Sequence, residues 1–293
     1  MLDKILHYII RRKGKQMRPI MIFLTAGLVG DISDKCYDGA LTIELLHSAT
    51  LVHDDVVDDS YQRRGAFSIN ALWRNKIAIL VGDFILGKGL TWCIEKKEYK
   101  FLELISEAVS AMSEGEIIQI EKARKLDITR DVYFDIIDKK TASLLACSAA
   151  IGAASTTKDE EIINDLKQFG RDLGIAFQIK DDLLDYQNSN IIGKPSGNDL
   201  RERKVTLPLI YALEKNDKSI QKKVLKKLRK KKKSSKDILE LTQFVKENGG
   251  LKHAEEVMQE YTQRAYDRIN KYPKSEYREA LIHYISFVTE RKK

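Results

Sequence analysis

The stretch from Leu41 to Asp58 reads LTIELLHSATLVHDDVVD and decides the fold of the chain. Its apolar residues recur at intervals of three and four, which is the period of an amphipathic helix. The same helical segment contains an acidic cluster, D-D-V-V-D, at residues 54–58. Because residues four apart share one face of a helix, Asp54 and Asp58 form a carboxylate pair. The stretch therefore predicts an apolar helix that carries a pair of acidic groups on one face.

A second cluster with the same spacing, D-D-L-L-D, occupies residues 181–185 of another apolar helical segment. Asp181 and Asp185 form the matching pair. Like charges at this spacing destabilise an isolated helix by about 0.2–0.5 kcal/mol per pair, so a structural role would place cations among them. A single cluster could be a helix amino terminus or a solvated face. Two copies, each set in apolar sequence, indicate a function.

Helical periodicity continues along the rest of the chain. Short polar segments separate the helices, strand-like alternation is absent, and no repeat or long linker divides the sequence. We therefore expect one all-α domain over residues 1–293. The expected helices cover residues 69–93, 101–122, 133–154, 161–186, 205–213, 237–248, 251–269 and 276–288.

The composition fits a folded helical protein. The 293 residues are 43% hydrophobic with 4 Pro, which excludes disordered and collagen-like classes and favours long helices. The longest uncharged apolar stretches, 20–30 and 142–154, are shorter than the roughly 18–20 residues of a membrane crossing. No signal peptide is visible, and the three cysteines lie far apart. We expect a cytoplasmic protein without a transmembrane segment.

The basic excess of the chain comes from one local run. The net charge is +8, and nine Lys and Arg residues lie within residues 222–233 without an intervening acid. Removing these nine charges from +8 leaves −1, so the surface is not basic as a whole and no nucleic-acid partner is expected. The run is interpreted as a solvated helix end or loop. The alternative is a weak peripheral attraction to anionic membranes.

Carboxylate clusters without His or Cys ligands nearby indicate a hard cation. Mg²⁺ is typically held by one or two carboxylates together with waters and substrate phosphates, so the clusters predict a phosphorylated substrate. The sequence also supplies basic residues that suit a second anionic group. They are Lys15, Arg18, Arg63, Arg64, Lys139, Lys140, Lys194 and Lys204.

These motifs resemble those of the trans (E-type) polyprenyl diphosphate synthases. The segment from Glu44 to Asp58, followed by Arg63-Arg64-Gly65, is similar to the first aspartate-rich motif of that family, and 177–185 is similar to the second. The similarity runs from about residue 10 to residue 215, with a helical tail beyond. Further landmarks match in order: Gly14-Lys15, Arg18-Pro19, Gly115-Glu116, Lys140-Thr141-Ala142, Gly193-Lys194, Gly197, Asp199-Leu200, Lys204 and Thr206-Leu-Pro-Leu.

The resemblance implies a single-domain isoprenoid-synthase helical bundle with a central apolar cavity, usually a homodimer. It also implies an enzyme that elongates a prenyl chain head to tail. About three Mg²⁺ ions would hold an allylic diphosphate, such as farnesyl or geranyl diphosphate, between the two clusters and stabilise the departing diphosphate. The double bond of isopentenyl diphosphate would attack the allylic cation, and a proton would then be lost.

The resemblance also assigns roles by position. The metal ligands would be Asp54, Asp55, Asp58, Asp181, Asp182 and Asp185. The allylic diphosphate would be held by Arg63, Lys140, Thr141, Gln178, Lys194 and Lys204. Isopentenyl diphosphate would be held by Lys15, Arg18, His47 and Arg64. The six aspartates, with Lys140 and Lys204, are the expected catalytic residues.

Helix geometry predicts different roles for the two histidines near the first cluster. His47 lies two turns before Asp54 and about 20° round the axis, so it shares the acidic face. A lone histidine in apolar sequence is otherwise a packed core residue. His53 points about 100° away and is expected to be structural. Packing roles are also expected for Tyr61, Tyr186 and the two Trp residues.

Product length is expected to depend on residues just before the first cluster. In the family, aromatic side chains there stop growth early, and here Ala49 and Thr50 are small. His47 and Ile43 extend this wall to roughly 16 Å of helix from Asp54, which suggests a long product of about 30 to 50 carbons, such as a quinone side-chain precursor. The floor of the tunnel is expected to come from residues 105–118.

Three features depart from the family pattern. Gln16 stands where Arg is common and removes one cation near isopentenyl diphosphate. Arg203 stands where Gly usually precedes Lys204, which alters the backbone approach beside the allylic site. The stretch before Gly14 is short, so we expect the first helix to be missing or trimmed.

Three rival functions can be stated. A terpene cyclase would share the helices and Mg²⁺, but it normally has one D-D-x-x-D and a different Asn/Ser/Glu cluster. A non-catalytic subunit of a heteromeric synthase should have lost aspartates, and all six are present here. A nucleic-acid binder would leave both acidic pairs unexplained.

Overall fold

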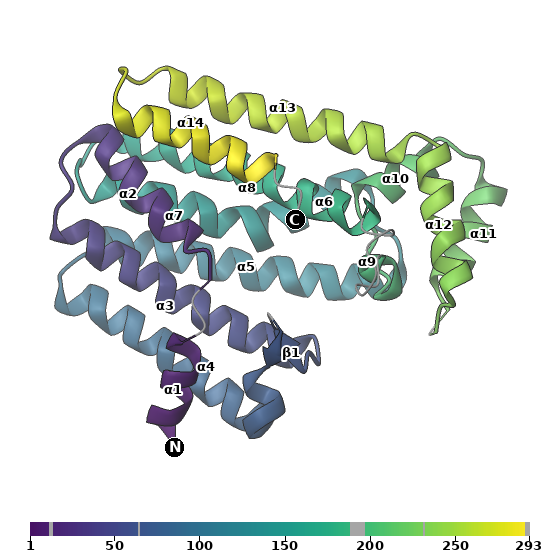
Figure 1. The fold of residues 1–293 in the computed structure, drawn as a ribbon, viewed down its shortest axis with the longest axis horizontal. Coiled ribbons are helices and arrows are strands. Elements are labelled where there is room, and N and C mark those ends of the chain that lie inside the picture. Colours follow the sequence, from purple (N-terminus) through teal and green to yellow (C-terminus); the bar gives the residue numbers. More distant parts are fainter. Residues whose placement is uncertain (12–13, 64, 188–196, 231, 291–293) are drawn as a thin grey trace. The chain divides into compact units, whose positions relative to one another are not determined.

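The computed structural model describes residues 1–11, 14–63, 65–187, 197–230 and 232–290. The predicted all-α architecture is confirmed, since these residues fold almost entirely into helices (Figure 1). The chain divides into two compact units, residues 1–107 with 147–166 and residues 108–146 with 167–293. Each unit is described by itself. The single domain and the central apolar cavity stay predictions.

The first unit is built on α3, the helix that the opening stretch of sequence predicts. α3 packs against α2 on one side and α4 on another (Figure 1). Buried residues of α4 recur at three- and four-residue intervals, as in an amphipathic helix. A short helix of nine residues, α1, precedes α2, and the expectation that the first helix of the family is missing or trimmed stays a prediction. The elements are α1 (Leu2–Ile10), α2 (Met17–Val29), α3 (Asp34–Val57), β1 (Gln62–Arg63), β2 (Ala66–Phe67) and α4 (Ile69–Glu95).

A small β-hairpin follows α3, and the sequence did not predict it. Gln62 pairs with Phe67 and Arg63 with Ala66 in antiparallel register. Gly65 in the turn has a φ of +75°, which glycine adopts without steric cost. Strands of two residues are too short to show an alternating pattern, so their sequence carries no strand signal. Tyr61, beside the hairpin, is 64% exposed, and its predicted packing role is wrong.

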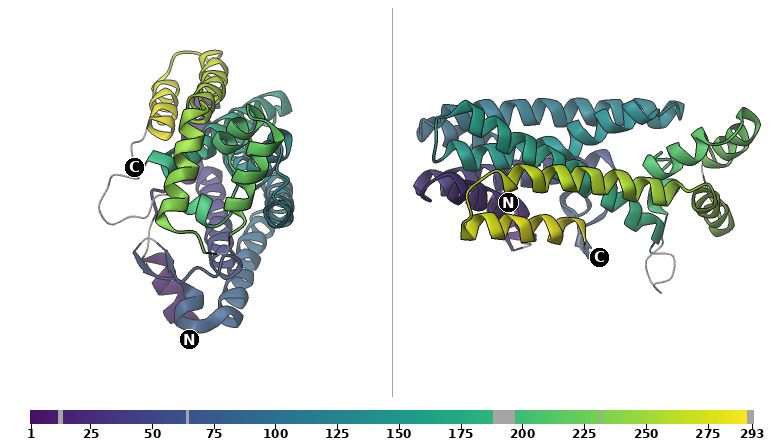
Figure 2. Two further views of the ribbon diagram at one scale, coloured as in Figure 1. Left: turned by 90° about the vertical axis from the view of Figure 1, so that its right-hand side faces the viewer. Right: turned by 90° about the horizontal axis from the view of Figure 1, so that it is seen from above.

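Most of the remaining helices belong to the second unit. The first residues of α5, the last of α7 and the first of α8 belong to the first unit. α13 and α14 form an antiparallel pair, which Figures 1 and 2 show from three sides. The elements are α5 (Tyr99–Lys125), α6 (Arg130–Ile137), the π-helical turn η1 (Asp138–Ala142), α7 (Ser143–Ala154), α8 (Glu160–Gln187), α9 (Asn198–Arg201), α10 (Leu207–Glu214), α11 (Lys218–Leu228), α12 (Ser235–Glu247), α13 (Gly250–Asn270) and α14 (Glu276–Thr289).

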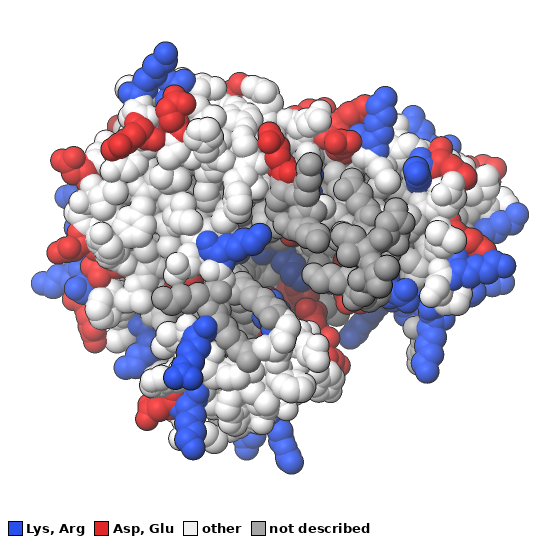
Figure 3. Space-filling view, viewed as in Figure 1, with Lys and Arg blue, Asp and Glu red and all other residues white. Residues whose placement is uncertain are grey.

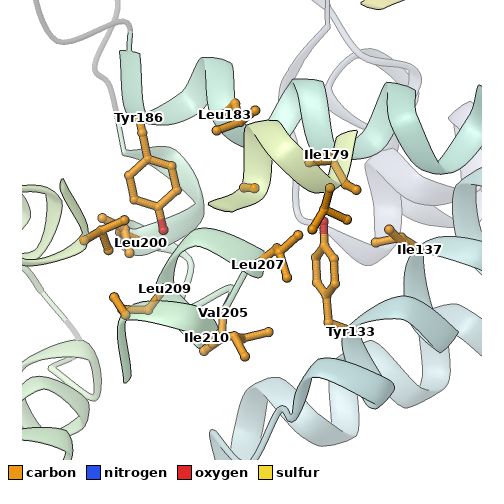
Figure 4. Close-up of a cluster of buried hydrophobic side chains, with 14 of the residues drawn as sticks. Tyr133, Ile137, Ile179, Leu183, Tyr186, Leu200, Val205, Leu207, Leu209 and Ile210 are labelled. Atoms are coloured by element: carbon orange, nitrogen blue, oxygen red, sulfur yellow. The ribbon is translucent and has the colours of Figure 1, made fainter. Parts of the chain in front are cut away.

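The core of the second unit joins α6, α8 and α10. Figure 4 shows Tyr133 and Ile137 of α6, Ile179 and Leu183 of α8, and neighbouring apolar side chains gathered in one cluster. Tyr186 of α8 also belongs to it and is 3% exposed, so its predicted packing role agrees with the structure. This apolar cluster holds the carboxyl-terminal part of α8, which carries the second acidic motif.

The lysine run lies on α11 and just beyond its end, as the interpretation of a solvated helix end requires. Two of its members are paired with α12, because Lys227 contacts Glu240 and Lys230 lies 2.7 Å from Asp237. Basic side chains gather at this end of the second unit (Figure 3). The weak membrane contact and the cytoplasmic location stay predictions.

One helix of the described residues, α4, is long and apolar enough to cross a membrane by length and composition alone. Of its most apolar window, 33% is buried. The rest of this window is not buried, so several apolar side chains of α4 are exposed in the single chain.

Candidate active site

The first acidic cluster lies where α3 ends. The backbone N–H of Asp58 donates to the carbonyl of Asp54 at 2.8 Å, so the last turn is still helical and the pair stays one turn apart. Asp58 is exposed and Asp54 is half-buried. The outer members of the cluster are therefore accessible to a ligand.

Asp55, the middle member, is turned inward. Its side chain accepts a hydrogen bond of 2.7 Å from Nε of Arg63, and the residue is 4% exposed. Its carbonyl accepts from the side-chain amide of Asn70 at 3.0 Å. Asp55 thus ties the end of α3 to the hairpin and to the start of α4. This position places the Arg63 guanidinium beside the acidic cluster, whereas Arg64 lies outside the described residues.

The two residues of the predicted chain-length wall have different surroundings. Ala49 is 1% exposed and packs in an apolar cluster with Ile5 of α1 and Ile85 of α4. Thr50 is half-buried, and its hydroxyl donates to the carbonyl of His47 at 2.9 Å. Their role as a wall stays a prediction.

His53 faces α4, as its direction on the helix predicts. Its Nε2 lies 3.2 Å from the carbonyl of Ile79 and 3.3 Å from the carboxylate of Asp83. A Cβ at Gly82 would approach this ring to 2.2 Å, so the glycine allows the two helices to meet here.

Lys15 and Arg18 lie at the amino end of α2. The helix begins at Met17, after Gln16, which has a φ of +50°. Lys15 is exposed and Arg18 is half-buried. Backbone N–H groups at a helix amino terminus favour anions, so this end of α2 suits a phosphate group.

In the second unit, a π-helical turn interrupts the helix predicted over residues 133–154. Turns of this kind are frequent at functional sites because they redirect side chains. Gly115 allows α5 to lie close to this turn, because a Cβ at that position would lie only 2.9 Å from the backbone nitrogen of Lys140. Lys140 forms an ion pair with Glu116, and Nζ of Lys139 lies 2.8 Å from Glu114. The turn therefore carries two basic side chains, each oriented by an acid of α5.

The second acidic cluster repeats the pattern of the first. Asp181 and Asp185 are half-buried, whereas the middle member, Asp182, is 3% exposed. Its two oxygens accept from the hydroxyl of Tyr133 at 2.7 Å and the amide nitrogen of Gln178 at 2.9 Å. Asp55 and Asp182 are buried, whereas the outer aspartates of both clusters are more accessible, and the metal-ligand role of the two middle residues stays a prediction.

Asp185 also binds the first residues of α9. Its carboxylate accepts the backbone N–H groups of Asn198 and Asp199 at 3.1 and 3.0 Å. Lys204 follows on the same segment, and its Nζ lies 2.7 Å from Glu202. Arg203 has a φ of +65°, so the backbone keeps the left-handed conformation that suits the glycine usual in the family. Lys194 lies outside the described residues.

Negative charge is crowded around this second cluster. Burial raises the pKa of Asp182 to about 8, with a further contribution from Asp199. Burial, followed by the charge of Asp185, raises the pKa of Asp199 to about 6. A divalent cation would offset this repulsion, and the oxygen-only donors suit Mg²⁺.

No group of three or more His, Cys, Asp or Glu side chains within the described residues could hold a metal ion by itself. The first unit brings Arg63 to Asp55, the middle residue of the first cluster, and the second unit joins Thr141, Gln178 and Asp182 through hydrogen bonds.

Two residues near the second cluster were not predicted as site residues. Tyr133 is 49 positions from Asp182, and nothing in its local sequence predicts the contact. Asp199 was noted only as a family landmark, and its proximity to Asp185 comes from the position of α9, where its backbone N–H donates to that carboxylate.

The chain is similar to known proteins over almost its whole length. A sequence model of the polyprenyl synthetase family matches residues 1–245. The all-trans-nonaprenyl-diphosphate synthase (geranyl-diphosphate specific) of Rhodobacter capsulatus is 36% identical over 286 residues, which are 97% of this chain and 87% of that protein. A decaprenyl diphosphate synthase structure from Rhodobacter capsulatus has a TM-score of 0.93 at 33% identity, covering 100% of this chain and 90% of its own. A polyprenyl synthase structure from Caulobacter crescentus, complexed with calcium and isoprenyl diphosphate, has a TM-score of 0.87 at 32% identity, covering 96% and 86%.

Proposed function

The chain belongs to the polyprenyl synthetase family and is a prenyltransferase, and we propose that it is a long-chain all-trans-polyprenyl diphosphate synthase. It condenses isopentenyl diphosphate head to tail onto an allylic diphosphate. The carbon–oxygen bond to the allylic diphosphate breaks, diphosphate leaves, a carbon–carbon bond forms to isopentenyl diphosphate, and a proton is lost. The observation that carries the proposal is the pair of D-D-x-x-D clusters, whose outer carboxylates are more accessible than the middle ones. Each cluster has a basic residue of its own unit nearby: Arg63 at the first, and Lys204, whose backbone N–H donates to Asp199, at the second.

Mg²⁺ fits the outer carboxylates of both clusters. Asp54 and Asp58 would hold it from the first unit, and Asp181 and Asp185 from the second. When bound, the cation supplies electrostatic stabilisation to the leaving diphosphate. The related Caulobacter crescentus protein is complexed with calcium and isoprenyl diphosphate, which supports a divalent cation in this family. The number of ions, about three by resemblance, is part of the proposal.

The basic residues divide between the two substrates. In the second unit, Lys140 and Lys204 bind the allylic diphosphate, and their acidic neighbours Glu116 and Glu202 orient them. In the first unit, Lys15 and Arg18 bind isopentenyl diphosphate at the amino end of α2, where the helix dipole adds to their charge. The two diphosphates are thus recognised by separate groups of cations.

The long product is supported by the small residues before the first cluster and by the names of similar proteins. Ala49 and Thr50 place no aromatic side chain there. The names given to similar Rhodobacter capsulatus synthases are nonaprenyl diphosphate synthase, for a related sequence, and decaprenyl diphosphate synthase, for a solved structure. On the family argument from this stretch of helix, the product has about 30 to 50 carbons.

A product assay tests the function directly. Purified protein with Mg²⁺, farnesyl diphosphate and labelled isopentenyl diphosphate is expected to form labelled polyprenyl diphosphates, which are separated by chain length after removal of phosphate. Chelating the metal should abolish the reaction, because the leaving group then lacks its counter-charge. Absence of any elongated product would contradict the proposed function. A cyclised hydrocarbon would identify a terpene cyclase, and a shorter linear product would contradict only the chain length.

The proposed homodimer is supported by apolar side chains on α4. Leu80 and Phe84 are 55% and 37% exposed and lie on the side of the helix opposite its buried stripe. Leu80→Glu is therefore expected to shift the protein from dimer to monomer, because it places a charge in an apolar interface. Sedimentation velocity measures the shift. Leu239→Glu is the matched control, since Leu239 is 66% exposed on α12. A monomeric parent protein, or a dimer that survives Leu80→Glu, would refute this interface.

A further inference from the structure

A charged pair joins the start of the π-helical turn η1 to α8. Arg171 of α8 donates from Nε to one oxygen of the Asp138 carboxylate and from Nη2 to the other. A bidentate pair of this kind fixes the relative orientation of the two groups as well as their distance. Asp138 is the first residue of η1. Neither residue is among the metal or substrate ligands assigned above, so the proposed reaction does not use the pair directly.

Asp138 also marks the point where the chain leaves the α-helical register. The backbone N–H of Ser143 donates to the carbonyl of Asp138, five residues earlier. This hydrogen bond defines a π-helix, which is rare and occurs mostly as single turns. Successive residues of an α-helix are rotated by about 100°, so a change to the α-helical bond would rotate the side chains of the turn by about that angle. Lys140 and Thr141, the allylic ligands of the turn, would then face elsewhere.

Close backbone contacts place η1 against α5 and α8. A Cβ at Gly174 of α8 would lie 2.6 Å from Cα of Ala142, and a Cβ at Gly115 of α5 would lie 2.9 Å from the backbone nitrogen of Lys140. Each glycine therefore lets a helix lie directly on the turn. A glycine has no side chain that could hold the turn in one rotation about its axis. The rotation depends instead on the polar side chains of the turn.

These side chains make their contacts at different points of the turn. Lys139 and Lys140 pair with acids of α5, and the hydroxyl of Thr141 donates to the amide oxygen of Gln178 on α8 at 2.8 Å. These three residues follow the first residue of the turn. Arg171 holds that first residue, where the register is set.

The next residue of α8 provides an internal comparison. Asp172 accepts a hydrogen bond of 2.9 Å from Nε of Arg268 on α13. Neighbouring positions of a helix point about 100° apart, so Arg171 faces the turn while Asp172 faces α13. The two charged pairs are adjacent in sequence and alike in chemistry, but the first joins α8 to η1 and the second joins it to α13.

We propose that Arg171 is a positioning residue which, through Asp138, holds the π-helical turn in the register that presents Lys140 and Thr141 to the allylic diphosphate. The proposal rests on the proposed function. A misplaced cation weakens the binding of the phosphate that it serves, so the loss should appear in the KM of that substrate. The cations assigned to isopentenyl diphosphate belong to the other unit, so the KM of that substrate should not change.

Steady-state kinetics of Arg171→Gln test the proposal, because glutamine stays polar but removes the charge and the bidentate geometry. We expect the KM for farnesyl diphosphate to rise about tenfold, while kcat and the KM for isopentenyl diphosphate change by less than about twofold. Asp138→Asn should have the same effect, and combining the two substitutions should raise the KM no further, because each removes the same pair. Arg171→Lys keeps the charge without the bidentate geometry and should raise this KM about threefold.

Arg268→Gln is the matched control, since it breaks the pair with Asp172 and should keep the parental KM for farnesyl diphosphate. Thermal unfolding shows whether each variant is folded, and Arg171→Lys decides the test if Arg171→Gln does not fold. An unchanged KM for farnesyl diphosphate in the folded Arg171 variants, an equal rise in both KM values, or effects that multiply in the double variant would overturn the positioning role. In each case the parent protein still elongates its substrate, so the proposed function survives. A parent protein without elongation activity would overturn both.

Discussion

Replacing Asp54 or Asp181 with Asn is expected to reduce kcat at least about a thousandfold, equivalent to about 4 kcal/mol of transition-state stabilisation. Each substitution keeps the shape of the side chain and removes one negative charge from a proposed Mg²⁺ site. The rate is measured at saturating substrate over a range of Mg²⁺ concentrations. Asp59→Asn is the matched control, because Asp59 is an exposed acid next to the first cluster but outside its spacing. Near-parental rates in both cluster variants would refute the metal assignment.

The fold should survive these substitutions. Asp54 and Asp181 are half-buried, and each lies four residues from a second acid. Like charges at this spacing destabilise a helix by about 0.2–0.5 kcal/mol, so removing one does not weaken the helix. Thermal unfolding followed by circular dichroism should give the parental midpoint. A large fall in that midpoint would mean that the lost rate reflects unfolding.

The double variant Asp54→Asn/Asp181→Asn tests whether the two clusters serve one reaction. If both hold metal around the same diphosphate, the double variant should lose little more rate than the worse single variant, because residues that act as a unit are not additive. Two independent sites would give losses that multiply. The experiment thus reports on the joint action of the two units through kinetics.

The second large expected effect concerns product length. Thr50→Phe should shorten the main product by about ten carbons or more, because Thr50 lies one turn from Asp54 on the same helix face, along the proposed path of the growing chain. Chromatography of the dephosphorylated products measures the change. Thr50→Val is the matched control, since it keeps the volume and removes only the hydroxyl that bonds to His47. It should leave the length unchanged.

Ala49→Phe should also shorten the product, with an added cost in stability. Ala49 is 1% exposed in an apolar cluster with α1 and α4, where overpacking typically costs about 1–3 kcal/mol. A lower unfolding midpoint is therefore expected for this variant and not for Thr50→Val. If neither aromatic substitution alters the product, the tunnel runs elsewhere.

The sequence alone predicted the helical class and the two acidic clusters, because both are local properties. A 3.6-residue period shows which face of a helix is apolar, and a spacing of four places Asp54 with Asp58 and Asp181 with Asp185. The basic motifs were found by resemblance, since their order along the chain matches the family. Prediction was less successful for elements whose pattern is short, such as the hairpin at residues 62–67.

The tertiary structure decided how the members of each cluster differ. In sequence the three aspartates of a motif look alike, but Asp55 and Asp182 are buried by segments that arrive from elsewhere in the chain. Tyr133 reaches Asp182 across 49 residues, and Gly115 of α5 admits the π-helical turn that carries Lys140. Such contacts depend on which helices pack together, a property of the whole chain that no local spacing encodes. The sequence therefore determined the chemistry available to this protein, and packing determined which carboxylates stay accessible and which are buried against their neighbours.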